Sequence, residues 1–271
     1  SEMCIRDSPY DISAEEIARR CQEAWGRGAT EVCMQGGIHP DYTGQTYLDI
    51  VATVKTAVPE MHIHAFSPLE VWQGAATLGI SLEEFLTQFK TAGLSTLPGT
   101  ASEILHDDIR KLICPDKLNT AQWLEVMTTA HKVGFTPTAT VMYGHGESPV
   151  HWASHLVAIR DLQIQTRGFT EFVPLPYVHM EAPMYLKGKS RAGPSFRESI
   201  LMHTIARIVF NDLIDNIQAS WVKMGQQGVL ACLNAGANDI GGTLMNESIT
   251  RAAGADHGQE WSPVGMESAL K

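Results

Sequence analysis

Amphipathic segments with capping residues recur along the chain and predict a series of helices. Ser13 and Glu16 form a capping box ahead of Ile17, Cys21 and Trp25, which share one helical face. Further helices are predicted to begin at Ser81, Thr120, Ser148 and Ser195. Their expected inward residues are Leu82, Phe85, Leu86 and Phe89; Leu124, Met127 and Val133; Trp152, Leu156 and Ile159; and Leu201, Ile205 and Ile208.

Short apolar or β-branched runs between these helices predict parallel strands, because strands separated by helices need crossover connections. Seven such strands favour a (β/α)8 TIM-type barrel, an α/β fold, over an open sheet. The alternation opens on a helix, so the first of eight strands is expected upstream of Pro9, which makes the barrel N-terminally truncated. The predicted strands are 31–35, 61–66, 94–97, 138–142, 170–174, 216–219 and 238–240.

Composition and charge indicate a globular protein that is neither nucleic-acid-binding nor membrane-spanning. The 271 residues are 44% hydrophobic and 18% charged, enough apolar material for a sizeable core. A net charge of -10 without basic clusters argues against nucleic-acid binding. No apolar run is long enough to span a membrane, and no signal peptide is visible. Five scattered cysteines suggest reduced thiols in a cytoplasmic protein.

The two ends of the chain differ from the rest in pattern. The opening octamer SEMCIRDS has no periodicity and is interpreted as a non-native leader, a sequencing artefact covering residues 1–8. Residues 9–271 are expected to form a single, incomplete barrel domain, with a C-terminal extension from about residue 244.

Candidate chemistry lies where the predicted strands end, since barrels of this class build their sites at the C-terminal strand ends. Gly36 and Gly37 follow one strand and allow close backbone approach, although a plain turn also explains them. His62 and His64 share one strand face, where they could ligate a metal or simply bond locally. From the residues alone, the chain is an acidic barrel with a polar ligand site.

A set of segments resembles a known family. EVCMQGGIHPD, HIHAFSPLEV, FVPLPYVHMEAP and IDNIQASWVK are similar to the CofH subunit of deazaflavin (FO) synthase, a radical S-adenosylmethionine (SAM) enzyme, and the likeness is collinear from about Pro9 to about Gly258. The segment GTLMNESITRAAG is shared with menaquinone-pathway relatives and supports the wider group only.

The resemblance implies a reaction and its cofactors. A CxxxCxxC loop holds a 4Fe-4S cluster, which cleaves SAM to methionine and a 5'-deoxyadenosyl radical. L-tyrosine then gives its 4-hydroxybenzyl group to 5-amino-6-(D-ribitylamino)uracil. A CofG-type partner, as a separate subunit or domain, closes the deazaflavin ring, and an electron donor is required.

The resemblance also implies site residues, with no catalytic residue identified. The residues expected to bind SAM are Gln35, Gly36, Gly37, Glu103 and Tyr143. Those expected to bind the substrates are His64, Ser67, His145, His179, Asn216, Gln218 and Ser220, with Lys223 beside them.

The cluster loop itself is absent from the chain. Cys21 lies on a predicted helix and Cys33 within a predicted strand, where it is expected to be packed. The chain is therefore expected to bind no metal and to be inactive as it stands, whereas its parent is expected to be active.

Three other functions stay open. The first is a menaquinone-pathway radical SAM enzyme of the aminofutalosine or dehypoxanthine futalosine branch. The second is a metal-dependent hydrolase barrel that uses His62 and His64. The third is a ligand-binding relative without catalysis.

Overall fold

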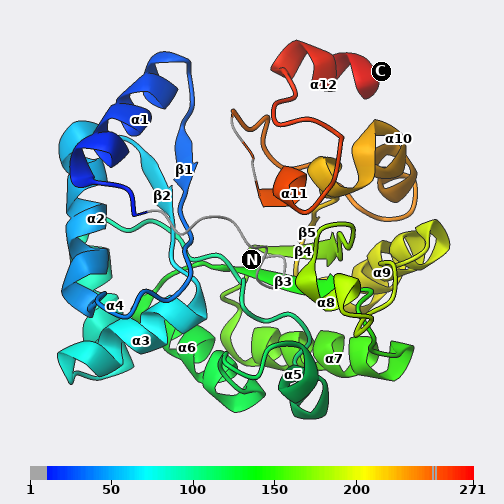
Figure 1. The fold of residues 1–271 in the computed structure, drawn as a ribbon, viewed down its shortest axis with the longest axis horizontal. Coiled ribbons are helices and arrows are strands. Elements are labelled where there is room, and N and C mark those ends of the chain that lie inside the picture. The colour runs from blue at the N-terminus through cyan, green and yellow to red at the C-terminus, as the bar shows by residue number, and fades with distance from the viewer. Residues whose placement is uncertain (1–10, 246, 248) are drawn as a thin grey trace. The chain divides into compact units, whose positions relative to one another are not determined.

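The computed structural model describes residues 11–245, 247 and 249–271, so the octamer interpreted as a leader lies outside it. Five short strands are separated by one or more helices along the described chain (Figure 1). The described residues form two compact units, one of residues 11–101 and 117–138, the other of residues 102–116, 139–245, 247 and 249–271.

The first unit is a two-stranded parallel sheet with helices packed on it. Residues Glu31 and Cys33 of β1 pair with His62 and His64 of β2, and Thr96 adds an isolated parallel bridge to His64. Neighbouring helices contact one another in the order α1, α2, α3, α4, α6. The elements are α1 (Ala14–Gly26), β1 (Glu31–Cys33), α2 (Gly44–Ala57), β2 (His62–His64), α3 (Pro68–Leu78), α4 (Leu82–Ala92) and α6 (Thr120–Val133).

The two faces of this sheet differ in chemistry because side chains alternate along a strand. Val32 and Ile63 point into the hydrophobic core, with Phe85 and Phe89 of α4 among its largest members. Glu31, Cys33, His62 and His64 occupy the other face, where none of them is fully buried. The sheet therefore presents one apolar face to its helices and one polar face.

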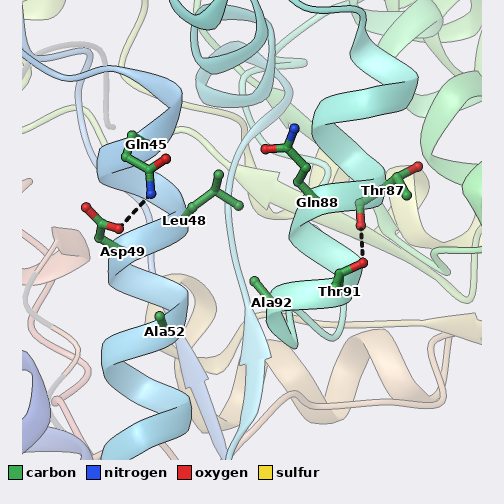
Figure 2. A pocket seen from close by; sticks show the side chains of 8 residues that line it. All are labelled: Gln45, Leu48, Asp49, Ala52, Thr87, Gln88, Thr91 and Ala92. Atoms are coloured by element: carbon green, nitrogen blue, oxygen red, sulfur yellow. Dashed lines mark hydrogen bonds between the residues drawn. The ribbon is translucent and has the colours of Figure 1, made fainter.

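A surface groove runs between α2 and α4 of the first unit, and Figure 2 shows the side chains that line it. Its side chains bond locally, as in the contact from Gln45 Nε2 to Asp49 Oδ1 at 2.8 Å. Asp49 is its only titratable group, and the groove lies on the helical side of the sheet. The lining residues are Gln45, Leu48, Asp49, Ala52, Thr87, Gln88, Thr91 and Ala92.

The second unit contains a three-stranded sheet in the order β3, β4, β5. Strands β4 and β5 are parallel, and Asp239 adds a parallel bridge to Gln218. Helix α9 packs on β4, β5, α7 and α10, and α10 is kinked at Gly225. The elements are α5 (Asp107–Ile113), β3 (Thr138–Tyr143), α7 (Pro149–Thr166), β4 (Glu171–Pro176), α8 (Pro183–Leu186), α9 (Phe196–Val209), β5 (Asn216–Ile217), α10 (Trp221–Leu233), α11 (Ile249–Ala252) and α12 (Pro263–Ala269).

The predicted strands are confirmed in position, although two are reduced to single bridges. Segments 31–35, 61–66, 138–142, 170–174 and 216–219 contain β1 to β5 or most of them, and segments 94–97 and 238–240 contain the bridging residues Thr96 and Asp239. The predicted starts of α1, α4, α6, α7 and α9 are confirmed as well.

The predicted inward face of α9 is wrong. Leu201, Ile205 and Ile208 are 43%, 45% and 70% exposed, and the buried face consists of Ser199, Met202, His203 and Ala206. Close packing of α9 on the sheet favours a face with small and polar residues over a face with larger apolar side chains.

Two other expected inward residues are less buried than predicted. Trp25 of α1 is 40% exposed, and on α6 the buried positions include Trp123 and Val126 rather than Leu124. Among the residues that the structure describes, no helix combines the length and apolar character needed to cross a membrane.

Candidate functional site

The predicted SAM contact of the first unit lies where β1 ends. Gln35, Gly36 and Gly37 follow the strand as an exposed segment without regular structure, and just before them the Met34 N–H bonds the His64 carbonyl at 3.0 Å. Ser67 is buried at the N-cap of α3, three residues after β2. The ends of β1 and β2 therefore bring these predicted residues into one neighbourhood.

Glu70 joins these segments. Its Oε1 accepts the Gly36 N–H at 3.0 Å, while its Oε2 accepts the N–H of Ser67 at 2.8 Å and the hydroxyl at 2.6 Å. Glu70 is 2% exposed. Burial raises the pKa of this carboxyl, and the hydrogen bonds from Ser67 and Gly36 oppose the rise. One side chain thus fixes the glycine strand end against the start of α3.

The sequence interpretation missed Glu70, although a local signal was present. Ser67 and Glu70 stand three residues apart before an apolar run, which is the spacing of a capping box. Such a box predicts the start of a helix. Its second role, bonding Gly36 from a neighbouring strand, depends on strand pairing that the sequence pattern does not specify.

His62 and His64 meet at a single hydroxyl. Thr96 Oγ1 lies 2.9 Å from His62 Nε2 and 2.7 Å from His64 Nδ1, and Glu31 Oε2 lies 3.5 Å from the same His62 nitrogen. Burial, and secondarily the charge of His62, lower the pKa of His64 to about 4. Local hydrogen bonding, one of the two alternatives left open for this pair, is what the structure contains.

Cys33 is exposed, so the expectation that it packs within its strand is wrong. It shares the polar sheet face with Gln35, whose Nε2 lies 3.5 Å from its Sγ.

The residues present do not fit an iron-sulfur cluster. The CxxxCxxC loop that the resemblance requires does not occur in the 271 residues. Within the part of the chain that the structure describes, no three His, Cys, Asp or Glu side chains are grouped so that they could hold a metal ion. The CxxxCxxC ligand set is therefore absent from the sequence, and the described residues offer no replacement for it.

In the second unit, predicted site residues gather where β3 ends. Tyr143 is the last residue of β3 and is fully buried, with its ring T-shaped against Trp152 at 5.6 Å. Burial raises the pKa of its phenol. His145 is also fully buried, and its ring lies 4.6 Å from that of Tyr177.

Glu147 holds the loop after β3 in place. Its Oε2 accepts the N–H groups of His145 at 2.9 Å and Gly146 at 3.0 Å, and its Oε1 accepts the N–H of Gly144 and the Trp152 indole N–H, the latter at 2.7 Å. Burial would raise the pKa of Glu147, but the hydrogen bond and charge of His145 and these other donors hold it below its usual range.

Glu103 lies beside the same strand, buried and with a φ of 38°. Its carbonyl accepts the Met142 N–H at 3.0 Å, and the neighbouring Ser102 hydroxyl donates to the Thr140 carbonyl at 2.7 Å. A non-glycine residue in the left-handed region is uncommon and costs conformational energy, so its position is set by these bonds to β3.

The remaining predicted residues lie on β5 and near the ends of β4 and β5. Asn216 is exposed and donates from Nδ2 to the Thr170 carbonyl at 3.2 Å, and Gln218 donates to Glu171 Oε1 at 3.0 Å. His179 is half-buried against the Tyr185 ring. Ser220 is buried at the N-cap of α10, and Lys223 lies in its first turn. The side chains of Asn216, Gln218 and His179 are thus engaged within their own unit.

Two family models match the chain. Residues 4–157 match the radical SAM superfamily, and residues 166–271 match the CofH/MqnC C-terminal region. In fold, the chain is similar to methylornithine synthase (PylB), with a TM-score of 0.64 at 18% identity over 85% of this chain and 62% of that one. The fold is thus the TIM-type α/β fold of radical SAM proteins.

Curated relatives agree with the family models. The chain is 52% identical to FO synthase of Mycobacterium leprae (strain TN) over 92% of its length, and 51% identical to that of Streptomyces avermitilis. It spans 29% of the length of each of these two proteins.

A third relative matches over most of its own length. The 5-amino-6-(D-ribitylamino)uracil--L-tyrosine 4-hydroxyphenyl transferase of Methanopyrus kandleri is 46% identical over 94% of this chain and 69% of that protein. The chain belongs to the radical SAM superfamily and, within it, to the family of this transferase.

Proposed function

We propose that this chain carries the substrate-binding part of a 5-amino-6-(D-ribitylamino)uracil–L-tyrosine 4-hydroxyphenyl transferase. That reaction moves the 4-hydroxybenzyl group of L-tyrosine to the ribitylaminouracil, with SAM consumed to methionine and 5'-deoxyadenosine. The observation that carries the proposal is the 46% identity to the Methanopyrus kandleri transferase across 94% of this chain.

The finer architecture forms part of the same proposal. Residues 9–271 supply the second to eighth strand positions of one TIM-type barrel, with an extension from about residue 244, and the cluster loop comes from sequence outside these residues. The order of parallel pairings within each unit supports this arrangement. The working enzyme is cytoplasmic, receives electrons from an electron donor, and passes its product to a CofG-type partner.

The glycine strand end suits the amino group of SAM. Because Glu70 takes the Gly36 N–H, the backbone group that Gly36 can offer to a ligand is its carbonyl oxygen. Carbonyl oxygens accept hydrogen bonds and therefore match an ammonium group rather than a carboxylate. Gln35, Gly36 and Gly37 are assigned to that contact.

The other predicted residues are assigned by their polarity and place at strand ends. Glu103 and Tyr143 border the rest of SAM. Hydroxyl and carbonyl groups of the two substrates are bound by His64, Ser67, His145, His179, Asn216, Gln218 and Ser220.

The proposal is tested with an extended protein that contains the cysteine ligands of the cluster. The first strand and CxxxCxxC loop of the Methanopyrus kandleri relative are joined to residue 9 of this chain, and the product is reconstituted anaerobically with iron and sulfide. With SAM, L-tyrosine and the ribitylaminouracil, mass spectrometry is expected to detect 5'-deoxyadenosine together with the tyrosine-derived adduct. The unextended chain and a loop Cys→Ala variant are the controls, and both are expected to be inactive.

Two outcomes would redirect the proposal. The CofH/MqnC region model names two groups, so the futalosine substrates of the menaquinone pathway are assayed in parallel. Turnover of a futalosine substrate, without the tyrosine adduct, would assign the chain to that branch. Stoichiometric cluster binding with SAM cleavage by the unextended chain would disprove the need for an external loop.

A further inference from the structure

On the polar face of the β1–β2 sheet, His62, Thr96 and His64 are linked in series by hydrogen bonds. Thr96 contributes one hydroxyl to two imidazoles, at 2.9 Å from His62 Nε2 and 2.7 Å from His64 Nδ1. Strand pairing fixes this geometry, because Thr96 bridges His64 and its backbone N–H and carbonyl bond Ile63 and Ala65. The three side chains are therefore held together by the sheet.

Counting protons on the hydroxyl leaves two arrangements. A threonine hydroxyl has one proton and two acceptor lone pairs, and the described residues offer its proton no acceptor besides the two imidazoles. It therefore donates to one imidazole and accepts from the other. In the first arrangement, His62 Nε2–H donates to Thr96 and the Thr96 hydroxyl donates to His64 Nδ1. In the second, His64 Nδ1–H donates to Thr96 and the Thr96 hydroxyl donates to His62 Nε2. The two directions leave His64 with opposite tautomers.

Glu31 selects between the two directions. Its Oε2 lies 3.5 Å from His62 Nε2, the nitrogen that also faces Thr96. A lone pair on that nitrogen would face the carboxylate unfavourably, whereas an N–H there is stabilised by it. His62 Nε2 therefore carries the proton, Thr96 donates its hydroxyl proton to His64 Nδ1, and His64 carries its own proton on Nε2.

The environment of His64 keeps its ring neutral at neutral pH, so the ring has a defined tautomer. Its lowered pKa of about 4 leaves the ring neutral, so that only one nitrogen bears a proton. His64 Nε2 has no hydrogen-bond partner among the described residues, and the residue is half-buried rather than enclosed. On an imidazole, Nε2 faces away from the side that bonds through Nδ1.

We propose that Thr96 is a positioning residue that holds His64 as a hydrogen-bond donor, with its Nε2–H directed at an oxygen acceptor of the substrate. The ligand contact rests on the proposed transferase function, whereas the tautomer does not. Suitable acceptors are a carbonyl oxygen of the ribitylaminouracil or the phenolic oxygen of L-tyrosine. A substrate analogue that offers only a donor at this position is expected to be rejected.

Nitrogen-15 NMR of histidine-labelled chain tests the tautomer without any cofactor. The His64 signals, assigned with His64→Gln and His62→Gln, are expected to show a protonated Nε2 and an unprotonated Nδ1 at neutral pH. Thr96→Val keeps the shape of the side chain but removes the hydroxyl, and is expected to give a mixture of tautomers. Thr96→Ser restores the hydroxyl and is expected to restore the single tautomer.

Two results would overturn the positioning role. One is the finding that His64 is protonated on Nδ1 in the unmodified chain. This measurement does not depend on whether any variant folds. The other is a Thr96→Val protein whose circular dichroism and thermal unfolding match the parent and whose His64 tautomer is unchanged. A purely structural Thr96 would affect stability without selecting a tautomer.

Separate titrations with L-tyrosine and with the ribitylaminouracil test the ligand contact. The ligand that accepts from His64 is expected to shift the Nε2–H signal, and the shift is expected to be lost in Thr96→Val and kept in Thr96→Ser. Saturating amounts of both ligands with no change at His64 would overturn the contact, whatever the transferase assay of the extended protein gives.

Discussion

The Glu70 carboxylate accepts the Gly36 backbone N–H at 3.0 Å and thereby ties the end of β1 to the first turn of α3. Its second oxygen is occupied by Ser67, so both oxygens of a buried carboxylate face donors. Because this bond engages the Gly36 N–H, the backbone group that Gly36 can offer a ligand is its carbonyl oxygen.

Replacing Glu70 with glutamine is expected to destabilise the chain. An amide has one oxygen and one NH2 group, so either Gly36 or Ser67 would face a donor in a buried place. Leaving such a group without an acceptor costs about 1–3 kcal/mol. Urea denaturation followed by circular dichroism measures the loss.

Glu84→Gln is the matched control for Glu70→Gln. Glu84 forms the same capping box with Ser81 at the start of α4, but it is exposed and bonds no other strand. Water can replace the lost acceptor there, so its loss of stability is expected to be clearly smaller. Equal losses in the two variants would show that the contact with Gly36 contributes nothing beyond the cap.

Glu147→Gln is expected to disturb the loop after β3. The carboxylate accepts from three backbone N–H groups and the Trp152 indole, and an amide NH2 would oppose at least one of these donors. The expected loss is about 1–3 kcal/mol. Trp152 emission should change as well, since its indole loses a charged acceptor.

Glu125→Gln controls for the change of charge. Glu125 lies on the exposed side of α6, and its replacement is expected to leave stability within about 0.5 kcal/mol of the parent. A Glu147→Gln protein with unchanged stability and unchanged tryptophan emission would contradict the role given to the carboxylate.

Acid is expected to destabilise the chain before most carboxylates titrate. Burial lowers the pKa of His64 and His131 to about 4 and that of His155 to about 3. Below the usual histidine pKa of about 6.5, the unfolded chain therefore binds protons that the folded chain does not, and stability falls as pH drops from about 6.5 toward 4.

Urea midpoints measured between about pH 7.5 and 5 test this dependence. His155→Gln is expected to reduce the slope with pH, since His155 is fully buried and accepts the Leu105 N–H at 3.0 Å. Replacing the exposed His257 with glutamine is expected to leave the slope unchanged. Stability that stays level or rises with acid would contradict the neutral, buried state of these rings.

Much of the fold was predictable because its signals are local. Ser81 and Ser195 begin helices through capping boxes that need only residues three positions apart. Ser13 caps its helix by accepting the Glu16 N–H, but the expected box is not complete, because the Glu16 carboxylate pairs with Arg19 and Arg20 instead. The strand segments were recognisable as short apolar runs between those helices. The alternation of strands and helices favoured a TIM-type barrel, and the family segments added the radical SAM family, which composition and spacing could not supply.

The sequence predicted that the candidate residues lie at strand ends, but not which hydrogen bonds connect them. The sequence places Gly36, His64 and Ser67 at strand ends, yet Glu70 and Thr96 join them across 34 and 32 residues of chain. Such bonds depend on which strands become neighbours and in what register, and the hydrophobic pattern leaves the register of a three-residue strand poorly specified.

The sequence by itself therefore determined the positions of the strand segments, the starts of five helices (α1, α4, α6, α7 and α9), and the residue types offered at the strand ends. The tertiary structure decided which face of α9 is buried, that Cys33 is exposed, and that one threonine hydroxyl links His62 to His64. The physical reason is that capping and periodicity act over a few residues, whereas burial and hydrogen-bond partners depend on how closely distant segments can pack.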